Sequence, residues 1–236
     1  MDTRNATARR AGVLYFIFMI VAIVGEFMMP AFTVIGDAAA TARNITTGEL
    51  LYRIDILLGF GTLVLFLFLV VNLYQLLRDT DRGQAMLMVV LVSVGVAVSL
   101  ANLLARFAPL VLLSGAGYLS AFTGPQREAL ALGFLRLHAA GAAVSIGFWG
   151  LWLFPFGILV IRSGFLPRVL GVLLMIAGSA YIVSSVTALA LPAYKGAVTR
   201  AMMPLYFGEV PIIFWLMIKG AKVPHAGLGA TAHVVA

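Results

Sequence analysis

Among the ionisable and amide side chains that interrupt the apolar stretches of this chain, eight are of types and at positions that could support chemistry. Charged groups are costly inside a membrane, where they usually pair with one another or mark a substrate or proton path. Arginines can bind an oxyanion, carboxylates can take a proton or a cation, and a histidine can act as a general acid or base. The sequence predicts a ligand site formed by Glu26, Arg53, Asp55, Asn102, Arg106, Arg136, His138 and Glu209.

The stretch LGFLRLHAAG, residues 132–141, places an arginine and a histidine two positions apart. Arg136 shares a helical face with a stripe of small residues that runs from Gly133 to Gly150 and would let a neighbouring helix come close. Arg136 is therefore expected to point into the helix bundle. His138 lies about 200° further round the helix, so the two side chains are not expected to form one local site.

Two other pairs of polar residues are spaced so that they share a helical face. Asn102 and Arg106 are four positions apart, and so are Glu49 and Arg53, with the acid N-terminal to the base. Arg53 and Arg106 lie near predicted helix ends, where each could instead extend toward lipid phosphates. Both interpretations stay open for these two arginines.

The elements that position these residues must be membrane-spanning helices, because of the composition. Of the 236 residues, 62% are hydrophobic and 11% are charged, and the mean hydropathy is +1.06. This apolar share far exceeds that of a soluble domain. The net charge of +7 would suggest nucleic acid for a soluble protein, but here the charges flank membrane helices, so no nucleic-acid partner is expected.

No cofactor or metal is expected. The chain contains no cysteine, which excludes disulfides, thiolate chemistry, iron–sulfur clusters and cysteine-type zinc sites. His138 alone is not expected to bind haem, because a haem in a membrane bundle is usually coordinated by two buried histidines. The other two histidines, His225 and His233, lie in a tail of mostly small residues and are interpreted as part of a flexible end.

Six apolar runs are long enough to cross about 30 Å of hydrocarbon. They predict an all-α integral membrane protein with a single six-helix transmembrane bundle over residues 1–222, followed by a cytoplasmic tail over 223–236. Capping-box patterns are predicted at Thr46 with Glu49 and at Thr123 with Gln126. The six runs cover approximately residues 11–36, 50–77, 84–113, 127–161, 168–192 and 201–218.

The basic residues predict the orientation of the bundle. Nine of them flank one side of the predicted membrane and four flank the other, and the richer side is expected to be cytoplasmic. Both termini are therefore expected in the cytoplasm, with the first helix retained in the inner membrane rather than cleaved as a signal. In this orientation the carboxylates lie deep and the arginines form a rim near the outer surface.

Three functions remain open on these residues. In the first, the outer half of the bundle binds or transports a small polar or anionic molecule or a lipid headgroup. In the second, the protein is an intramembrane enzyme, a hydrolase or transferase, with His138 as general acid or base and Glu209 orienting it. The third is a structural or assembly role. Glu209 could bind a proton or cation, or pair with an arginine, and Pro211 would free a backbone carbonyl beside it.

Several stretches resemble a known family. They are LRLH at 135–138, WGLWLFPFGILVIRSGFLPRVLGVLLMIAGSAY at 149–181 and GEVPIIFWLMIKG at 208–220. Together they resemble the bacterial membrane family catalogued as domain of unknown function 4386, over approximately residues 8–220. The resemblance implies a multi-pass membrane protein without an established activity, with His138, Arg162, Pro167 and Glu209 at recurring motif positions. The resemblance supplies no substrate. The site residues and the apolar runs predict a possible small polar or anionic ligand and membrane lipids as partners, and the oligomeric state stays undetermined.

Overall fold

The computed structural model describes residues 3–28 and 32–221, with side chains for all of these except 26–28. In this part of the chain every regular element is helical, which confirms the predicted all-α fold class. The longer helices are α1 (Thr3–Met28), α2 (Ala38–Thr47), α3 (Glu49–Leu77), α4 (Arg82–Leu112), α5 (Gly124–Leu151), α6 (Leu153–Arg162), α7 (Arg168–Ala190), α8 (Lys195–Tyr206) and α9 (Val210–Phe214). Short helical turns cover Gly117–Leu119, Pro192–Tyr194 and Phe207–Glu209, and a π-helical segment covers Trp215–Lys219.

Six helical spans of the described chain are long and apolar enough to cross a membrane, so the predicted number is confirmed. Two of them are composite: α5 and α6 form one span, and the last runs from the turn before α8 to the π-helical segment after α9. Pro155 accounts for the break between α5 and α6, because a proline removes a backbone donor and crowds the carbonyl four residues earlier. The spans are Thr3–Gly25, Glu49–Leu77, Arg82–Leu112, Gly124–Arg162, Arg168–Ala190 and Pro192–Lys219.

The connection between the first two spans differs from the prediction. Residues 38–47 form the separate helix α2, whose N-cap is Asp37, with its carboxylate accepting from the Ala40 backbone N–H at 2.8 Å. The predicted capping box of Thr46 with Glu49 is wrong, because the Thr46 hydroxyl donates to the Ala42 carbonyl of α2 and the N-cap of α3 is a glycine.

The second predicted capping box is confirmed. Thr123 accepts from the Gln126 backbone N–H, and the Gln126 side chain accepts from the Thr123 backbone N–H at 2.8 Å. This exchange satisfies two backbone donors at the start of α5 and fixes where that helix begins.

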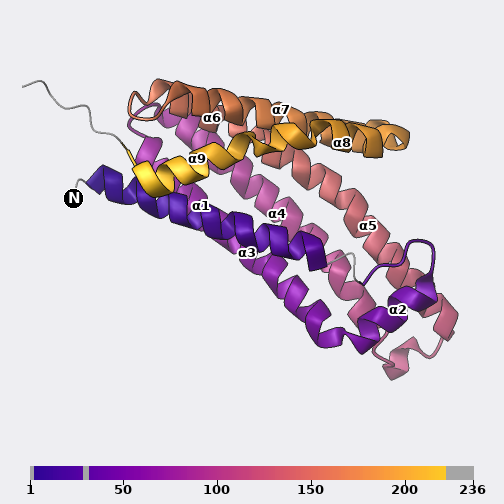
Figure 1. Cartoon of the computed structure of the whole chain (residues 1–236). Helices are drawn as coiled ribbons and strands as arrows, with labels where there is room; N and C mark the ends of the chain where they lie inside the picture. The colour runs from indigo at the N-terminus through magenta and orange to yellow at the C-terminus, as the bar shows by residue number, and fades with distance from the viewer. Residues whose placement is uncertain (1–2, 29–31, 222–236) are drawn as a thin grey trace, which may run out of the picture.

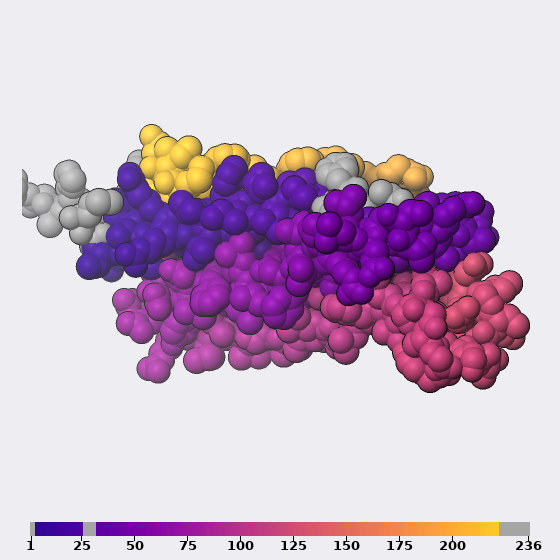
Figure 2. Space-filling model, turned by 90° about the horizontal axis from the view of Figure 1, so that it is seen from below, coloured from indigo at the N-terminus to yellow at the C-terminus, as the bar shows by residue number. Residues whose placement is uncertain are grey.

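Both described ends of the chain lie at one end of the bundle (Figure 1). Arg9 of α1 donates to the Ile218 carbonyl at 3.4 Å, and the Asn5 side chain accepts from the Ala221 N–H at 3.2 Å. Figure 2 shows α1 beside the C-terminal segment at this end, with the residues before and at the start of α5 gathered at the other. We call these the N-terminal end and the far end of the bundle.

Glycines bring α7 into backbone contact with α5 and α6. A Cβ added at Gly178 would lie 2.8 Å from the Gly150 carbonyl oxygen, and one at Gly157 would lie 2.7 Å from that of Gly171. Small residues allow such close approach in membrane bundles, where packing replaces the hydrophobic effect between helices. Beyond this contact the ribbons of α5 and α7 diverge toward the far end (Figure 1).

Connections at the N-terminal end are tied by charged residues. Arg162 at the end of α6 pairs with Asp81 at 2.7 Å, and Arg4 lies over the Phe165 ring at 5.2 Å. Asp81 is the N-cap of α4, and the hydrogen bond from the Gln84 backbone N–H, assisted by Arg162, lowers the pKa of its carboxyl group. Arg162, which the family resemblance implied to be a motif position, therefore joins two connections that are 81 residues apart in the sequence.

Candidate functional site

A cavity of about 260 Å³ lies among α1, α3, α4 and α5. We call it the polar cavity, because three of these helices contribute polar side chains to an otherwise apolar lining. Its apolar wall includes Val21 and Ala22 of α1 and Leu63 of α3. The polar lining residues are Asp55, Thr62, Ser99, Asn102, Arg106, His138, Ser145 and Trp149.

An ion pair forms one wall of the polar cavity. The Arg106 guanidinium contacts the Asp55 carboxylate, and their side chains are 8% and 0% exposed. The backbone carbonyl of Arg106 also accepts from the buried Tyr52 hydroxyl at 2.8 Å. Charges removed from water need a partner of opposite sign, so each member of this pair holds the other in place.

A reciprocal clamp joins α4 to α5 in the same cavity. The Asn102 side-chain amide donates to the His138 carbonyl at 3.0 Å, and His138 Nδ1 lies 3.0 Å from the Asn102 carbonyl oxygen. A carbonyl can only accept, so Nδ1 is the donor in this contact. Gly141 leaves room for the clamp, since a Cβ at this position would overlap the Asn102 side chain.

Apart from the ion pair of Asp55 and Arg106, three polar atoms of the lining are buried without a hydrogen-bond partner in the described part of the protein. They are the hydroxyls of Ser99 and Ser145 and the indole nitrogen of Trp149. Buried polar groups are nearly always satisfied by protein, water or a ligand. The cavity therefore offers hydrogen-bonding capacity that the described side chains leave unused.

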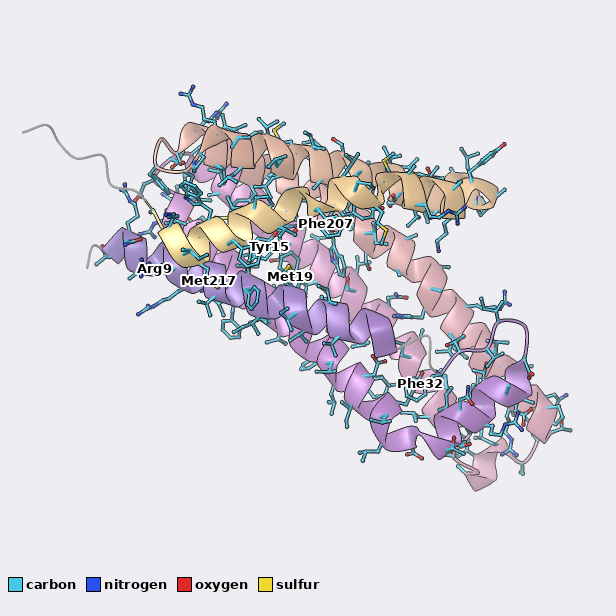
Figure 3. The ribbon with its side chains drawn as sticks, in the orientation of Figure 1. Arg9, Tyr15, Met19, Phe32, Phe207 and Met217 are labelled. Atoms are coloured by element: carbon cyan, nitrogen blue, oxygen red, sulfur yellow. The ribbon has the colours of Figure 1, made fainter. Side chains whose placement is uncertain are left out.

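A second cavity, of about 330 Å³, lies next to the first and shares Ala22 and Trp149 with it. We call it the aromatic cavity, because eight of its fifteen lining residues are aromatic. Figure 3 shows Tyr15, Met19 and Phe207 of its lining between α1 and the last span. Glu209 is the charged residue of this lining.

The Glu209 carboxylate is bound by tyrosines from two helices. The Tyr15 hydroxyl of α1 donates to it at 2.5 Å, and Tyr181 of α7 is a second hydrogen-bonding partner. Glu209 ends the turn Phe207–Glu209, where the last span leaves α-helical geometry before α9. Pro211 accounts for this change, because it cannot donate to the Phe207 carbonyl four residues earlier.

The predicted site residues fall into separate groups. Asp55, Asn102, Arg106 and His138 meet in the polar cavity, and Glu209 lies in the aromatic cavity. Within residues 3–28 and 32–221 no ion pair involves Glu209, so the predicted structural pairing with an arginine is not found there.

Three predicted residues lie elsewhere. Arg53 is on the surface, 53% exposed, and pairs with Glu49 at 2.7 Å as its spacing indicated. Arg136 is exposed, so the prediction that it points into the bundle is wrong; α5 has diverged from α7 before reaching it. Glu26 belongs to α1, but its side chain lies outside the described residues.

Sequence reasoning missed the residues that complete both cavities. Ser99 and Ser145 belong to none of the sequence motifs. Ser99 lies three residues before Asn102, and Ser145 lies seven after His138, so each shares a helical face with a predicted site residue. That spacing was the available signal. No sequence pattern indicated Tyr15, because its hydrogen-bonding partner Glu209 is 194 positions away in the chain.

Comparison with known proteins gives a family but no activity. A protein of Archaeoglobus fulgidus named "Uncharacterized protein" is 41% identical over 76 residues, which cover 32% of this chain and 44% of that relative. No solved structure matches the chain. The family model matches residues 10–220, from the first span to the end of the last. The chain therefore belongs to the membrane protein family described as domain of unknown function (DUF4386).

Proposed function

We propose that this membrane protein binds a small polar or anionic molecule, or the polar headgroup of a lipid, in the polar cavity. The observation that carries the proposal is the group of buried polar atoms of Ser99, Ser145 and Trp149 without partners in the described chain. Each unsatisfied buried group costs about 1–3 kcal/mol. A ligand that supplies hydrogen bonds to all three would offset this cost.

The donors around the cavity indicate the chemistry of the ligand. The indole N–H of Trp149 can only donate, serine hydroxyls can donate, and the Arg106 guanidinium lines the same space. These groups favour a molecule that presents oxygen acceptors, such as a carboxylate or a phosphate. The apolar wall favours a ligand with an apolar body next to those oxygens.

The arrangement of the two cavities supports movement of the ligand along the bundle. Because Ala22 and Trp149 line both, a molecule leaving the polar cavity toward the middle of the bundle would enter the aromatic cavity. Binding sites near the middle of a membrane bundle are typical of transporters. Transport is therefore part of the proposal.

The enzyme alternative lacks supporting geometry. His138 lines the polar cavity and Glu209 lines the aromatic cavity, so no described cavity holds both. A catalytic acid and base must lie within hydrogen-bonding distance of each other or of the same substrate. A purely structural role leaves the unused donors of the polar cavity unexplained.

Binding of benzoate, a carboxylate with an apolar body, tests the proposal. Calorimetric titration of the detergent-purified protein should show saturable binding, and Ser145→Ala should weaken it on the order of tenfold, since a hydrogen bond to a charged group is worth about 1.5–3 kcal/mol. Ser179→Ala is the matched control, because that exposed hydroxyl donates to its own helix at the Met175 carbonyl. Absence of saturable binding up to about 10 mM, or equal binding by Ser145→Ala, would contradict the proposal.

We also propose that the N-terminal end of the bundle faces the cytoplasm, in the inner membrane. The basic residues are biased to this end: arginines at positions 4, 78, 82, 162 and 168 lie at or next to helix ends there, and Arg9 and Arg10 lie within the first turns of α1. The chain has no cysteine, so single-cysteine variants Thr3→Cys and Ser120→Cys can be labelled separately on intact cells. An impermeant maleimide should label Ser120→Cys and not Thr3→Cys; the reverse pattern would invert the orientation.

A further inference from the structure

The aromatic cavity combines a carboxylate with many aromatic rings, and the polar-cavity proposal makes no use of this combination. The Glu209 carboxyl group accepts from the hydroxyls of Tyr15 and Tyr181, and both of these partners are uncharged donors. None of the ion pairs in the described segments includes it. A carboxylate accepts hydrogen bonds at about four positions, so two tyrosines do not exhaust it.

The eight rings come from five spans and line the same cavity as that carboxylate. Tyr181 and Tyr206 stack with their centroids 4.5 Å apart, and Tyr15 and Trp152 are tilted with centroids 6.1 Å apart. The faces of aromatic rings attract cations, most strongly where water is excluded, and such cages bind quaternary ammonium groups. A carboxylate within the cage adds a full opposite charge.

The mouth of the aromatic cavity lies on the side of the bundle. Ile23 of α1, Met203 of α8 and Phe207 line the cavity and are also exposed, Phe207 at 64%. In a membrane this surface is covered by lipid, because it lies within two apolar spans. The access route therefore favours a cation that carries apolar groups over a hydrated metal ion, and among the described residues no group of three or more metal-type ligands is found.

We propose that the aromatic cavity binds a small quaternary ammonium compound, with Glu209 as its counter-ion. Tyr15 and Tyr181 hold the carboxylate in place, and the rings of Trp152, Tyr206 and Phe207 surround the alkyl groups of the cation. This site is separate from the polar cavity and does not depend on benzoate binding there. Each proposal can therefore fail while the other holds.

Choline is the probe that tests this site, with its uncharged carbon analogue dimethylbutanol as the matched ligand. The two molecules share size and hydroxyl group and differ in the charge at the quaternary centre. Calorimetric titration of the full-length protein in detergent should show saturable choline binding, with dimethylbutanol weaker on the order of tenfold or more. Glu209→Gln should reduce choline binding by a similar factor, because the amide keeps the shape but lacks the charge.

Glu49→Gln is the control variant, since it removes an exposed carboxylate that pairs with Arg53 on the surface, and it should bind choline like the wild type. Equal binding of choline and dimethylbutanol by the wild-type protein would overturn the proposal without any variant, even if Glu209→Gln failed to fold. Wild-type affinity in a folded Glu209→Gln protein, or no choline binding up to about 10 mM, would also overturn it.

Discussion

Replacing Arg106 with methionine is expected to lower the free energy of unfolding by about 3–5 kcal/mol, because it leaves the Asp55 carboxylate buried without its partner. Asp55 is fully buried and Arg106 nearly so, which means that water cannot replace the lost guanidinium. Methionine retains much of the apolar length of the arginine side chain, so the decrease in the free energy of unfolding comes mainly from the missing charge. Unfolding by SDS in mixed micelles would measure it.

Arg53→Met is the matched control for this variant. Its pair with Glu49 is exposed on the surface of α3, and exposed pairs contribute about 0–1 kcal/mol. Adding Asp55→Leu to Arg106→Met should restore most of the stability, because it removes the stranded charge. Similar losses for the Arg106 and Arg53 variants would show that the buried pair does not stabilise the bundle.

Gly157→Ala is expected to destabilise the contact between α6 and α7 by about 1–3 kcal/mol, the usual cost of adding a methyl group to a closely packed interface. The new Cβ would lie 2.7 Å from the Gly171 carbonyl oxygen. A backbone atom cannot rotate away as a side chain can, so the two helices must separate. The decrease should appear in the same SDS unfolding measurement.

Gly61→Ala provides the comparison, because nothing lies within 4 Å of the position where its Cβ would be. Alanine favours a helix over glycine by up to about 1 kcal/mol, so this variant should be as stable as the wild type or slightly more stable. If Gly157→Ala behaved like Gly61→Ala, the close approach of α6 and α7 would be refuted.

Features set by short-range sequence patterns were predictable. The six spans follow from runs of apolar residues, and the capping box at Thr123 and Gln126 depends on two residues three positions apart. The pair of Glu49 and Arg53 follows from the spacing of four along one helix. The first connection was not predictable in this way, since α2 is too short and too polar to resemble a span.

The residues that line each cavity depend on which helices pack against one another. Helical periodicity shows which residues share a face of one helix, but it does not show which other helix that face contacts. Arg136 shares a face with glycines that do pack against α7, yet it is exposed because α5 and α7 diverge before that point. Asn102 and His138 meet because α4 and α5 pack together with these two residues side by side. No local sequence pattern determines how two helices are aligned along their length. Glu209 was expected among the arginines, but Arg106 is bound by Asp55, and Glu209 is bound by Tyr15 and Tyr181.

The two proposed sites differ in the charge of the ligand that each one suits. The polar cavity presents donors and a guanidinium, which suit oxygen acceptors, whereas the aromatic cavity presents rings and a carboxylate, which suit a cation. Because Trp149 lines both, a ligand in one site can contact the wall of the other.

An experimental density map of the protein purified from its membrane, without added ligand, tests the polar-cavity site most directly. We expect density for a non-protein molecule in this cavity, within hydrogen-bonding distance of the Ser99 and Ser145 hydroxyls and the Trp149 indole nitrogen. The shape of that density would distinguish a free solute from a lipid headgroup. A map in which these three groups bond to protein atoms, with the cavity closed around them, would contradict the account.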